Sequence, residues 1–196
     1  VGLNATNVDS DEDGLFDGFD DLNDNGHWDP GEPGEDIDLD GIVDRYETDP
    51  LLADSDADNL EDGIEWLIGS NPLDSDTDSD LLLDGQEYYD FGTSVLSNDT
   101  DSDNLDDYIE NNLTLTDPTE WSTFNNGTSD YDLDSDFDGV TNGLEIDQYD
   151  TSPGDADSDD DLLYDGLEIF TYGTDPLKED SDQDRLTDWE EVVLYD

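Results

Sequence analysis

The apolar residues of this chain come in short groups, separated by stretches in which acidic residues stand at alternate positions. The main groups are 64–68, 88–89, 144–146, 167–170 and 189–194. Each could form about two turns of helix, and Gly69, Gly92 or Gly173 follows three of them, where a left-handed C-terminal cap is favoured. Helices this short are unstable alone in water, so the neighbouring acidic stretches must hold them.

The acidic stretches repeat a pattern of twelve residues. In the clearest copy, DIDLDGIVDRYE at 36–47, oxygen-bearing side chains stand at loop positions 1, 3, 5, 9 and 12, with Gly41 at position 6. Ca²⁺ takes about six to eight oxygen ligands, and alternate residues of a tightly turning loop can aim carboxylates at one point. Because the pattern recurs, the repeat is the unit of this chain. The other copies begin at Asp9, Asp21, Asp54, Asp76, Asp99, Asp134, Asp157 and Asp180.

These nine loops predict about nine or more calcium ions. Position 7 would supply its backbone carbonyl, position 9 often acts through water, and position 12 would close the shell with both carboxylate oxygens. In the first loop position 12 is Asp20, whose shorter side chain predicts a weaker site. The expected ligands, loop by loop, are Asp9, Asp11, Asp13, Asp17, Asp20; Asp21, Asn23, Asn25, His27, Asp29, Glu32; Asp36, Asp38, Asp40, Ile42, Asp44, Glu47; Asp54, Asp56, Asp58, Leu60, Asp62, Glu65; Asp76, Asp78, Asp80, Leu82, Asp84, Glu87; Asp99, Asp101, Asp103, Leu105, Asp107, Glu110; Asp134, Asp136, Asp138, Val140, Asn142, Glu145; Asp157, Asp159, Asp161, Leu163, Asp165, Glu168; and Asp180, Asp182, Asp184, Leu186, Asp188, Glu191.

Two kinds of residue depart from the simple loop. Position 6, where a left-handed conformation is wanted, holds Leu81, Leu162 and Arg185 in three copies, and these side chains carry a steric cost there. Position 2 should point away from the ion, so replacing Ser158 should do little. An extra Asp two residues upstream of some loops is either a solvated charge or a bridge to a second ion; these are Asp74, Asp132 and Asp155.

The loops and their connecting phrases resemble the thrombospondin type 3 repeat in its prokaryotic surface-protein form. The motifs that carry the resemblance are DGLEIFTYGTDPLKEDSDQDRLTDWEE at 165–191 and IEWLIGSNPLDSDTDSD at 64–80. The resemblance covers nearly the whole chain and implies an extracellular calcium-binding spacer shaped by its ions. A second resemblance, to the dockerin type of EF-hand loop, is local to DLNDNGHWDPGE at 21–32.

Composition supports the metal interpretation. The 196 residues include 62 acidic and three basic ones, for a net charge of −59, and 31% are hydrophobic, which without ions predicts disorder. Adaptation to high salt would also favour acidity. However, Asp outnumbers Glu by 48 to 14 and stands mostly at alternate loop positions, which surface solubility does not require.

Several functional classes are disfavoured. Nucleic acid would be repelled by the charge, and each Asp already has a place in a loop where calcium would keep it ionised, so an enzyme is not expected. His27 is the sole histidine and there is no cysteine, which leaves no triad or zinc site. The chain contains no apolar run long enough for membrane insertion. Four glycosylation acceptors, Asn4, Asn98, Asn112 and Asn126, favour a surface glycoprotein.

The predicted fold is mainly irregular: a linear array of EF-hand-like calcium loops with short α-helices, little or no β-sheet and a minimal hydrophobic core. Its apolar seam would consist of the position 7 residues such as Leu60 and Leu163. By sequence pattern the chain divides into an N-terminal connecting segment (1–8), three closely spaced loops (9–53) and loop-plus-helix repeats (54–196), with a lateral insertion at 111–131 that carries Trp121 and Phe124.

The expected function is a calcium-dependent extracellular or cell-surface structural element: a rigid stalk, fibre or filament segment. Its expected partner is itself, because residues 1–8 laid after Asp196 would continue the repeat and place Val193 and Tyr195 against residues 1–20 of a neighbour. Other surface proteins or glycans are possible further partners. The alternative is a calcium-stabilised adhesion or docking module that uses the 111–131 segment or the dockerin-like loop.

Overall fold

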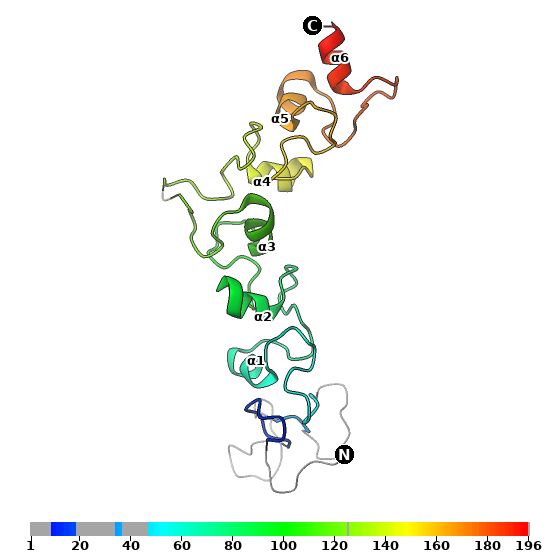
Figure 1. Cartoon of the computed structure of the whole chain (residues 1–196). Coiled ribbons are helices and arrows are strands. Elements are labelled where there is room, and N and C mark those ends of the chain that lie inside the picture. The colour runs from blue at the N-terminus through cyan, green and yellow to red at the C-terminus, as the bar shows by residue number, and fades with distance from the viewer. Residues whose placement is uncertain (1–8, 19–33, 37–46, 125, 196) are drawn as a thin grey trace. The chain divides into compact units, whose positions relative to one another are not determined.

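The computed structural model describes residues 9–18, 34–36, 47–124 and 126–195 (Figure 1). Apart from an isolated bridge residue at Gly34, these residues contain no strand, and most of them lie in loops and turns. The predicted fold class, irregular structure with short helices, is therefore confirmed. None of the described helices is long and apolar enough to cross a membrane.

The chain forms two compact units, residues 1–98 and 99–196. The first contains α1 (Asp62–Ile68), α2 (Asp84–Gln86) and the π-helical turn η1 (Glu87–Phe91). The second contains α3 (Asp107–Ile109), η2 (Glu110–Thr114), α4 (Asn142–Leu144), η3 (Glu145–Tyr149), α5 (Asp165–Leu167), η4 (Glu168–Tyr172) and α6 (Asp188–Tyr195). The division by sequence pattern at residues 8 and 53 stays a prediction.

Each described α-helix begins at position 9 of a loop, and each π-helical turn begins at position 12. The helices end where the backbone turns left-handed, with φ of +90° at Gly69, +77° at Gly92 and +78° at Gly173. Leu115 and Asp150 adopt the same conformation, with φ of +56° and +58°, without being glycine. A module is therefore one twelve-residue loop followed by about two turns of helix, and we use the word in that sense below.

The apolar core is small and sits at loop position 7. Leu15, Leu60, Leu82, Leu105, Val140 and Leu163 are all at most 4% exposed. Most larger apolar side chains are exposed, among them Trp66, Phe137 and Phe170. The predicted apolar seam is confirmed at these positions, whereas Leu186, in the last loop, is only half-buried. Burial of one side chain per module cannot by itself offset the entropy of ordering some twenty residues at about 1–2 kcal/mol each.

The segment 111–131 has the hydrogen bonds of a loop. Counting Ser122 as position 1, the Thr123 hydroxyl (position 2) donates to Asp130 (position 9) at 2.7 Å, and the Thr128 amide (position 7) donates to Asn126 Oδ1 (position 5) at 2.8 Å. Gly127, at position 6, has φ of +85°. We call residues 122–133 the degenerate loop, because positions 1, 3, 5 and 12 carry no carboxylate. It splits the longest spacing, from Asp99 to Asp134, into steps of 23 and 12 residues.

Candidate metal centres

Three of the described loops gather their first three aspartates around one point. In the loop that begins at Asp54, ligand atoms of Asp54, Asp56 and Asp58 all lie within 4.8 Å of one another. The same holds for the first three alternate aspartates of the loops that begin at Asp9 and Asp76. Like charges about 4 Å apart repel by about 1 kcal/mol in water and by about 4 kcal/mol near a protein surface. These groups therefore need a cation or a proton to be stable.

The backbone of the loop is shaped by its own aspartates. Asp54, at position 1, accepts hydrogen bonds from the amides of Ala57 at 2.7 Å and Asn59 at 3.1 Å, and Asp58 accepts from the amide of Leu60 at 2.6 Å. These bonds turn positions 4 and 6 left-handed, with φ of +66° at Ala57 and +76° at Asn59. The strain expected at position 6 is present, with φ of +82° at Leu81, +85° at Leu162 and +89° at Arg185. The left-handed turn at position 4 was not anticipated.

Oxygens left without a hydrogen bond point to the metal. One buried carboxylate oxygen has no hydrogen-bond partner at position 3 (Asp56 Oδ2, Asp101 Oδ2, Asp159 Oδ2) and at position 12 (Glu65 Oε2, Glu110 Oε2, Glu168 Oε2). A buried acceptor without a partner costs about 1–3 kcal/mol, and more when charged. The residues therefore fit a hard cation held by oxygen alone.

The glutamates at position 12 are the most strongly perturbed carboxyls. Burial, together with the charges of Asp56 and Asp58, raises the pKa of Glu65 to about 9. The pKa of Glu110 is likewise raised to about 9 and that of Glu87 to about 8, again mainly by burial. At position 3, burial raises the pKa of Asp56 to about 6. A bound cation would reverse these shifts by stabilising the ionised form.

The other oxygen of each closing glutamate is held by a hydroxyl. Thr93, Thr116 and Thr174 donate to Oε1 of Glu87, Glu110 and Glu168 at 3.1, 3.1 and 3.0 Å. Ser70 and Thr151 bond Glu65 and Glu145 in the same way, at 3.2 and 3.3 Å. These hydroxyls, five or six residues after the glutamate, fix the direction of the free Oε2. The sequence interpretation did not include them.

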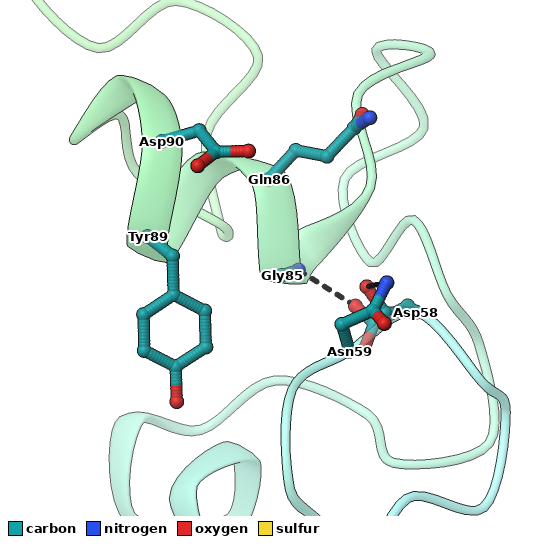
Figure 2. Close-up of a pocket in the computed structure, with 6 residues that line it drawn as sticks. All are labelled: Asp58, Asn59, Gly85, Gln86, Tyr89 and Asp90. Carbon is teal, nitrogen blue, oxygen red and sulfur yellow. Dashed lines mark hydrogen bonds between the residues drawn. The ribbon is translucent and has the colours of Figure 1, made fainter.

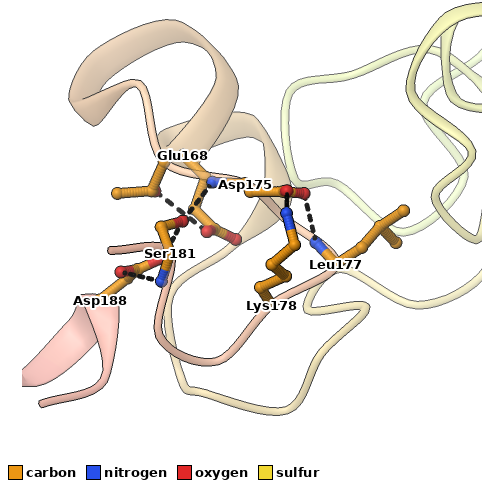
Figure 3. Close-up of polar contacts among 7 residues, drawn as sticks. Glu168, Asp175, Leu177, Lys178, Ser181 and Asp188 are labelled. Carbon is orange, nitrogen blue, oxygen red and sulfur yellow. Dashed lines mark hydrogen bonds and ion pairs between the residues drawn. The ribbon is translucent and has the colours of Figure 1, made fainter. Parts of the chain in front are cut away.

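Position 2 has a structural role that the sequence interpretation missed. The Ser158 amide and hydroxyl donate to Asp165 Oδ1 and Oδ2 at 2.9 and 2.6 Å, and the Ser158 hydroxyl accepts from the Ser152 amide at 3.1 Å. Figure 3 shows the equivalent contacts of Ser181 with Asp188 and Asp175. The position 2 residue thus ties the turn before the loop to the first residue of the helix. The expectation that replacing Ser158 should do little did not take these hydrogen bonds into account.

We call the hydrogen bonds between positions 2 and 9 the brace. The residue pattern that predicts the brace was present in the sequence. All seven loops that begin at Asp9, Asp54, Asp76, Asp99, Asp134, Asp157 and Asp180 carry Ser or Thr at position 2, opposite Asp or Asn at position 9. The position 9 side chains were predicted above to be ligands that often act through water. Where the residue is Asp, both of its carboxylate oxygens accept hydrogen bonds from the position 2 residue, as in Asp165. Ser135 and Asn142 make the amide version of the pair, at 2.9 Å.

Within each unit, the backbone amide at position 10 of one loop can donate a hydrogen bond to the position 5 aspartate of the loop before it. The Gly85 amide donates to Asp58 Oδ2 of the loop before it at 2.7 Å, and Gly166 donates to Asp138 Oδ2 at 2.7 Å. We call this hydrogen bond between modules the joint. Figure 2 shows the joint between Gly85, on α2, and Asp58, with Tyr89 and Asp90 on the helical turn η1 that follows α2. A Cβ added at Gly85 would lie 2.4 Å from the Asp58 carbonyl oxygen. Glycine therefore permits the close contact between loop and helix.

Part of the predicted ligand set falls outside the described residues. The loop that begins at Asp21 lies wholly outside them, and the loop 36–47 is described only at Asp36 and Glu47, both buried. Of the predicted acceptors, Asn98, Asn112 and Asn126 are exposed. The expected residues that lie outside are Asn4, Asp20, Asp21, Asn23, Asn25, His27, Asp29, Glu32, Asp38, Asp40, Ile42 and Asp44.

Comparison with known proteins adds little. No family model matches the chain, and no curated protein matches it. Two solved structures are similar to part of it: a biofilm associated protein BSP domain and a biofilm associated protein B domain, each 33% identical with a TM-score of 0.23. The matches cover 23% and 24% of this chain, and 8% and 11% of those chains.

Proposed function

We propose that this chain is a calcium-dependent structural element of the extracellular space or cell surface, in which each bound ion folds and stiffens one module. The observation that carries the proposal is the recurring pair of buried oxygens without hydrogen-bond partners, Oδ2 at position 3 and Oε2 at position 12. Positions 1, 3, 5, 7 and 12 would hold the ion. Calcium suits this set better than magnesium, which demands near-ideal octahedral geometry and keeps several waters.

The ion would supply most of the stability. One buried apolar residue per module cannot order the loop, whereas a bound ligand stabilises the folded state by about 2.7 kcal/mol at one hundred times its dissociation constant. Nine ions would carry 18 positive charges against a net charge of −59. Extracellular calcium modules bind at about 10⁻⁴ to 10⁻³ M, which the extracellular concentration sustains. The carboxylates have structural places throughout, so we assign no catalytic role to them.

The test is calcium depletion of the whole chain. Far-UV circular dichroism should lose its helical signal after dialysis against chelator and regain it with calcium, and titration calorimetry should count about nine ions. A variant with Asp56→Asn and Glu65→Gln should bind fewer ions, while Asp90→Asn, on an exposed residue of η1, should bind the full number. An unchanged spectrum in fully depleted protein would refute the proposal.

Stiffness needs its own measurement. Spin labels at two exposed positions of the first unit, Leu67 and Asp90, should report a narrow distance distribution with calcium and a broad one without it. Equal widths would mean that the ions do not rigidify the array. The head-to-tail self-association expected from the sequence stays a prediction, because residues 1–8 lie outside the described residues.

A docking role is the second candidate, favoured by one observation. Trp121 and Phe124, at the degenerate loop, are 48% and 66% exposed. Replacing both with serine should leave calcium binding and thermal stability unchanged if these rings only contact a partner. Loss of cell-surface attachment in that variant, with the stiffness of the array intact, would favour docking over a purely mechanical role.

A further inference from the structure

The first loop contains a buried glutamate that the twelve-residue pattern does not explain. Glu35 is 0% exposed, and no described residue donates a hydrogen bond to Oε1 or Oε2. One of its oxygens lies in a group with oxygens of Asp13 and Asp62, all within 4.8 Å of one another. A carboxylate buried among carboxylates without any donor is stable only if it is protonated or bound to a cation.

The backbone of Glu35 takes the place of a position 12 residue. In the regular loops the amide of position 12 donates to the carbonyl of position 8: Glu65 to Glu61 at 3.1 Å, and Glu168 to Tyr164 at 3.1 Å. Position 8 of the first loop is Phe16, and the Glu35 amide donates to the Phe16 carbonyl at 3.2 Å and also to the Gly18 carbonyl at 3.1 Å. Glu35 therefore enters the first loop by the same hydrogen bond, although it follows Asp9 by 26 residues instead of 11.

The electrostatic surroundings match as well. Glu35 faces Asp11 and Asp13, positions 3 and 5 of the first loop, as Glu65 faces Asp56 and Asp58 in its own loop. It also faces Asp62, position 9 of the module that packs on the first loop, as Glu110 faces Asp130. That packing is the standard joint, since the Gly63 amide donates to Asp13 Oδ2 at 3.0 Å.

We propose that Glu35, and not Asp20, is the ligand that closes the first calcium site. The inference rests on the proposed calcium function. Binding at Asp9, Asp11, Asp13 and Glu35 would tie the first loop to a residue that follows Asp9 by 26 positions.

The test compares three single variants of the full chain: Glu35→Gln, Asp20→Asn and Glu65→Gln. Calcium is titrated by calorimetry, and hydrogen exchange is followed at the amides of Leu15 and Gly63. Glu35→Gln should lose one ion, and should lose protection at both amides. Asp20→Asn should keep the ion count and the protection.

The outcomes separate this inference from the general function. If Glu65→Gln loses an ion and Glu35→Gln does not, or if Asp20→Asn loses as much as Glu35→Gln, the assignment of Glu35 is overturned while the calcium function stands. If Glu65→Gln also loses none, the calcium function itself fails. Should Glu35→Gln unfold the first unit, Glu35→Asp at raised calcium gives the same comparison, and protected amides of the second unit show that the chain is intact.

Discussion

The regular loop at 99–110 and the degenerate loop at 122–133 share the hydrogen bonds between positions 2 and 9 but not the carboxylates at positions 1, 3, 5 and 12. In both, a threonine at position 2 bonds an aspartate at position 9: Thr100 to Asp107 at 2.6 Å, and Thr123 to Asp130 at 2.7 Å. The Tyr131 amide even makes the standard joint, donating to Asp103 of the loop before it at 3.0 Å.

The degenerate loop replaces the ligands. Positions 1, 3 and 5 are Ser122, Phe124 and Asn126, and position 12 is Leu133. The brace between positions 2 and 9 and the joint at position 10 are thus separable from cation binding. The degenerate loop continues the array through the hydrogen bonds of Thr123 and Tyr131, without carboxylates at positions 1, 3, 5 and 12.

The largest expected difference between the two kinds of loop is in pH dependence after calcium depletion. Burial raises the pKa of Glu110 from 4.5 to about 9 and that of Asp101 from 3.8 to about 6. A raised pKa in the folded state contributes stability that is present below the ordinary pKa and is lost as pH rises through the raised value. The depleted chain should therefore be most folded near pH 4.5 and should unfold towards pH 9, while added calcium should reverse the trend.

Circular dichroism and residue-resolved hydrogen exchange between pH 4.5 and 9 check this expectation. The degenerate loop lacks carboxylates at positions 1, 3 and 12, so protection at Thr128 should change least with pH. A depleted protein that becomes more stable from pH 5 to pH 8 would contradict the crowding of carboxylates in the regular loops.

The next largest effect is expected at the joint. Gly85→Ala would place a Cβ against the backbone of Asp58, which is not a flexible side-chain end, so we expect a loss of about 3 kcal/mol or more, as for other backbone clashes. Positions 10 of two other joints in the second unit, Tyr131 and Trp189, already carry side chains and still make the bond. Thermal melts in calcium should show the loss of stability. Asp90→Ala, at an exposed residue of the following turn η1, is the control.

A third prediction tries to abolish the difference between the loops. Restoring carboxylates to the degenerate loop by Ser122→Asp, Phe124→Asp, Asn126→Asp and Leu133→Glu should create one more calcium site. Calorimetry should count one additional ion, and stability should rise by about 2.7 kcal/mol at one hundred times the dissociation constant. An unchanged count would show that the degenerate loop differs from the regular ones in more than its ligands.

The sequence predicts the loops and the helices. It does not predict the role of Glu35 or the degenerate loop, because neither follows the local pattern of alternating carboxylates. Alternating aspartates revealed the loops, and apolar groups after position 9 revealed the helices, because both are local patterns. Glu35 escaped because it follows Asp9 by 26 residues, beyond a twelve-residue pattern, and only the fold brings its amide to the Phe16 carbonyl. The degenerate loop escaped because the search began from alternating carboxylates, whereas its shape depends on the Thr123–Asp130 hydrogen bond and the left-handed Gly127.

The brace between positions 2 and 9 should contribute equally in both kinds of loop. Ser158→Ala and Thr123→Val each remove a hydroxyl that donates to a buried carboxylate and accepts from a backbone amide. Hydrogen bonds to charged groups contribute about 1.5–3 kcal/mol, so both variants should melt measurably lower. A Ser158→Ala variant with an unchanged melting temperature would support the original expectation that replacing Ser158 does little.

The smallest effect is expected at the hydroxyl that holds the closing glutamate. Thr174→Val keeps the shape of the side chain but removes the bond to Glu168 Oε1, while Oε2 remains free to bind the ion. Because a position 12 ligand would then lose only its orientation, calcium affinity of that site should fall by less than in Glu168→Gln, and stability should fall by about 0.5–1.5 kcal/mol. The degenerate loop has Leu133 at position 12 and therefore no carboxylate that a hydroxyl could orient. Calorimetry of Thr174→Val beside Glu168→Gln decides the point: equal losses of affinity would make the hydroxyl part of the site, and no loss would make it a capping contact of η4 alone.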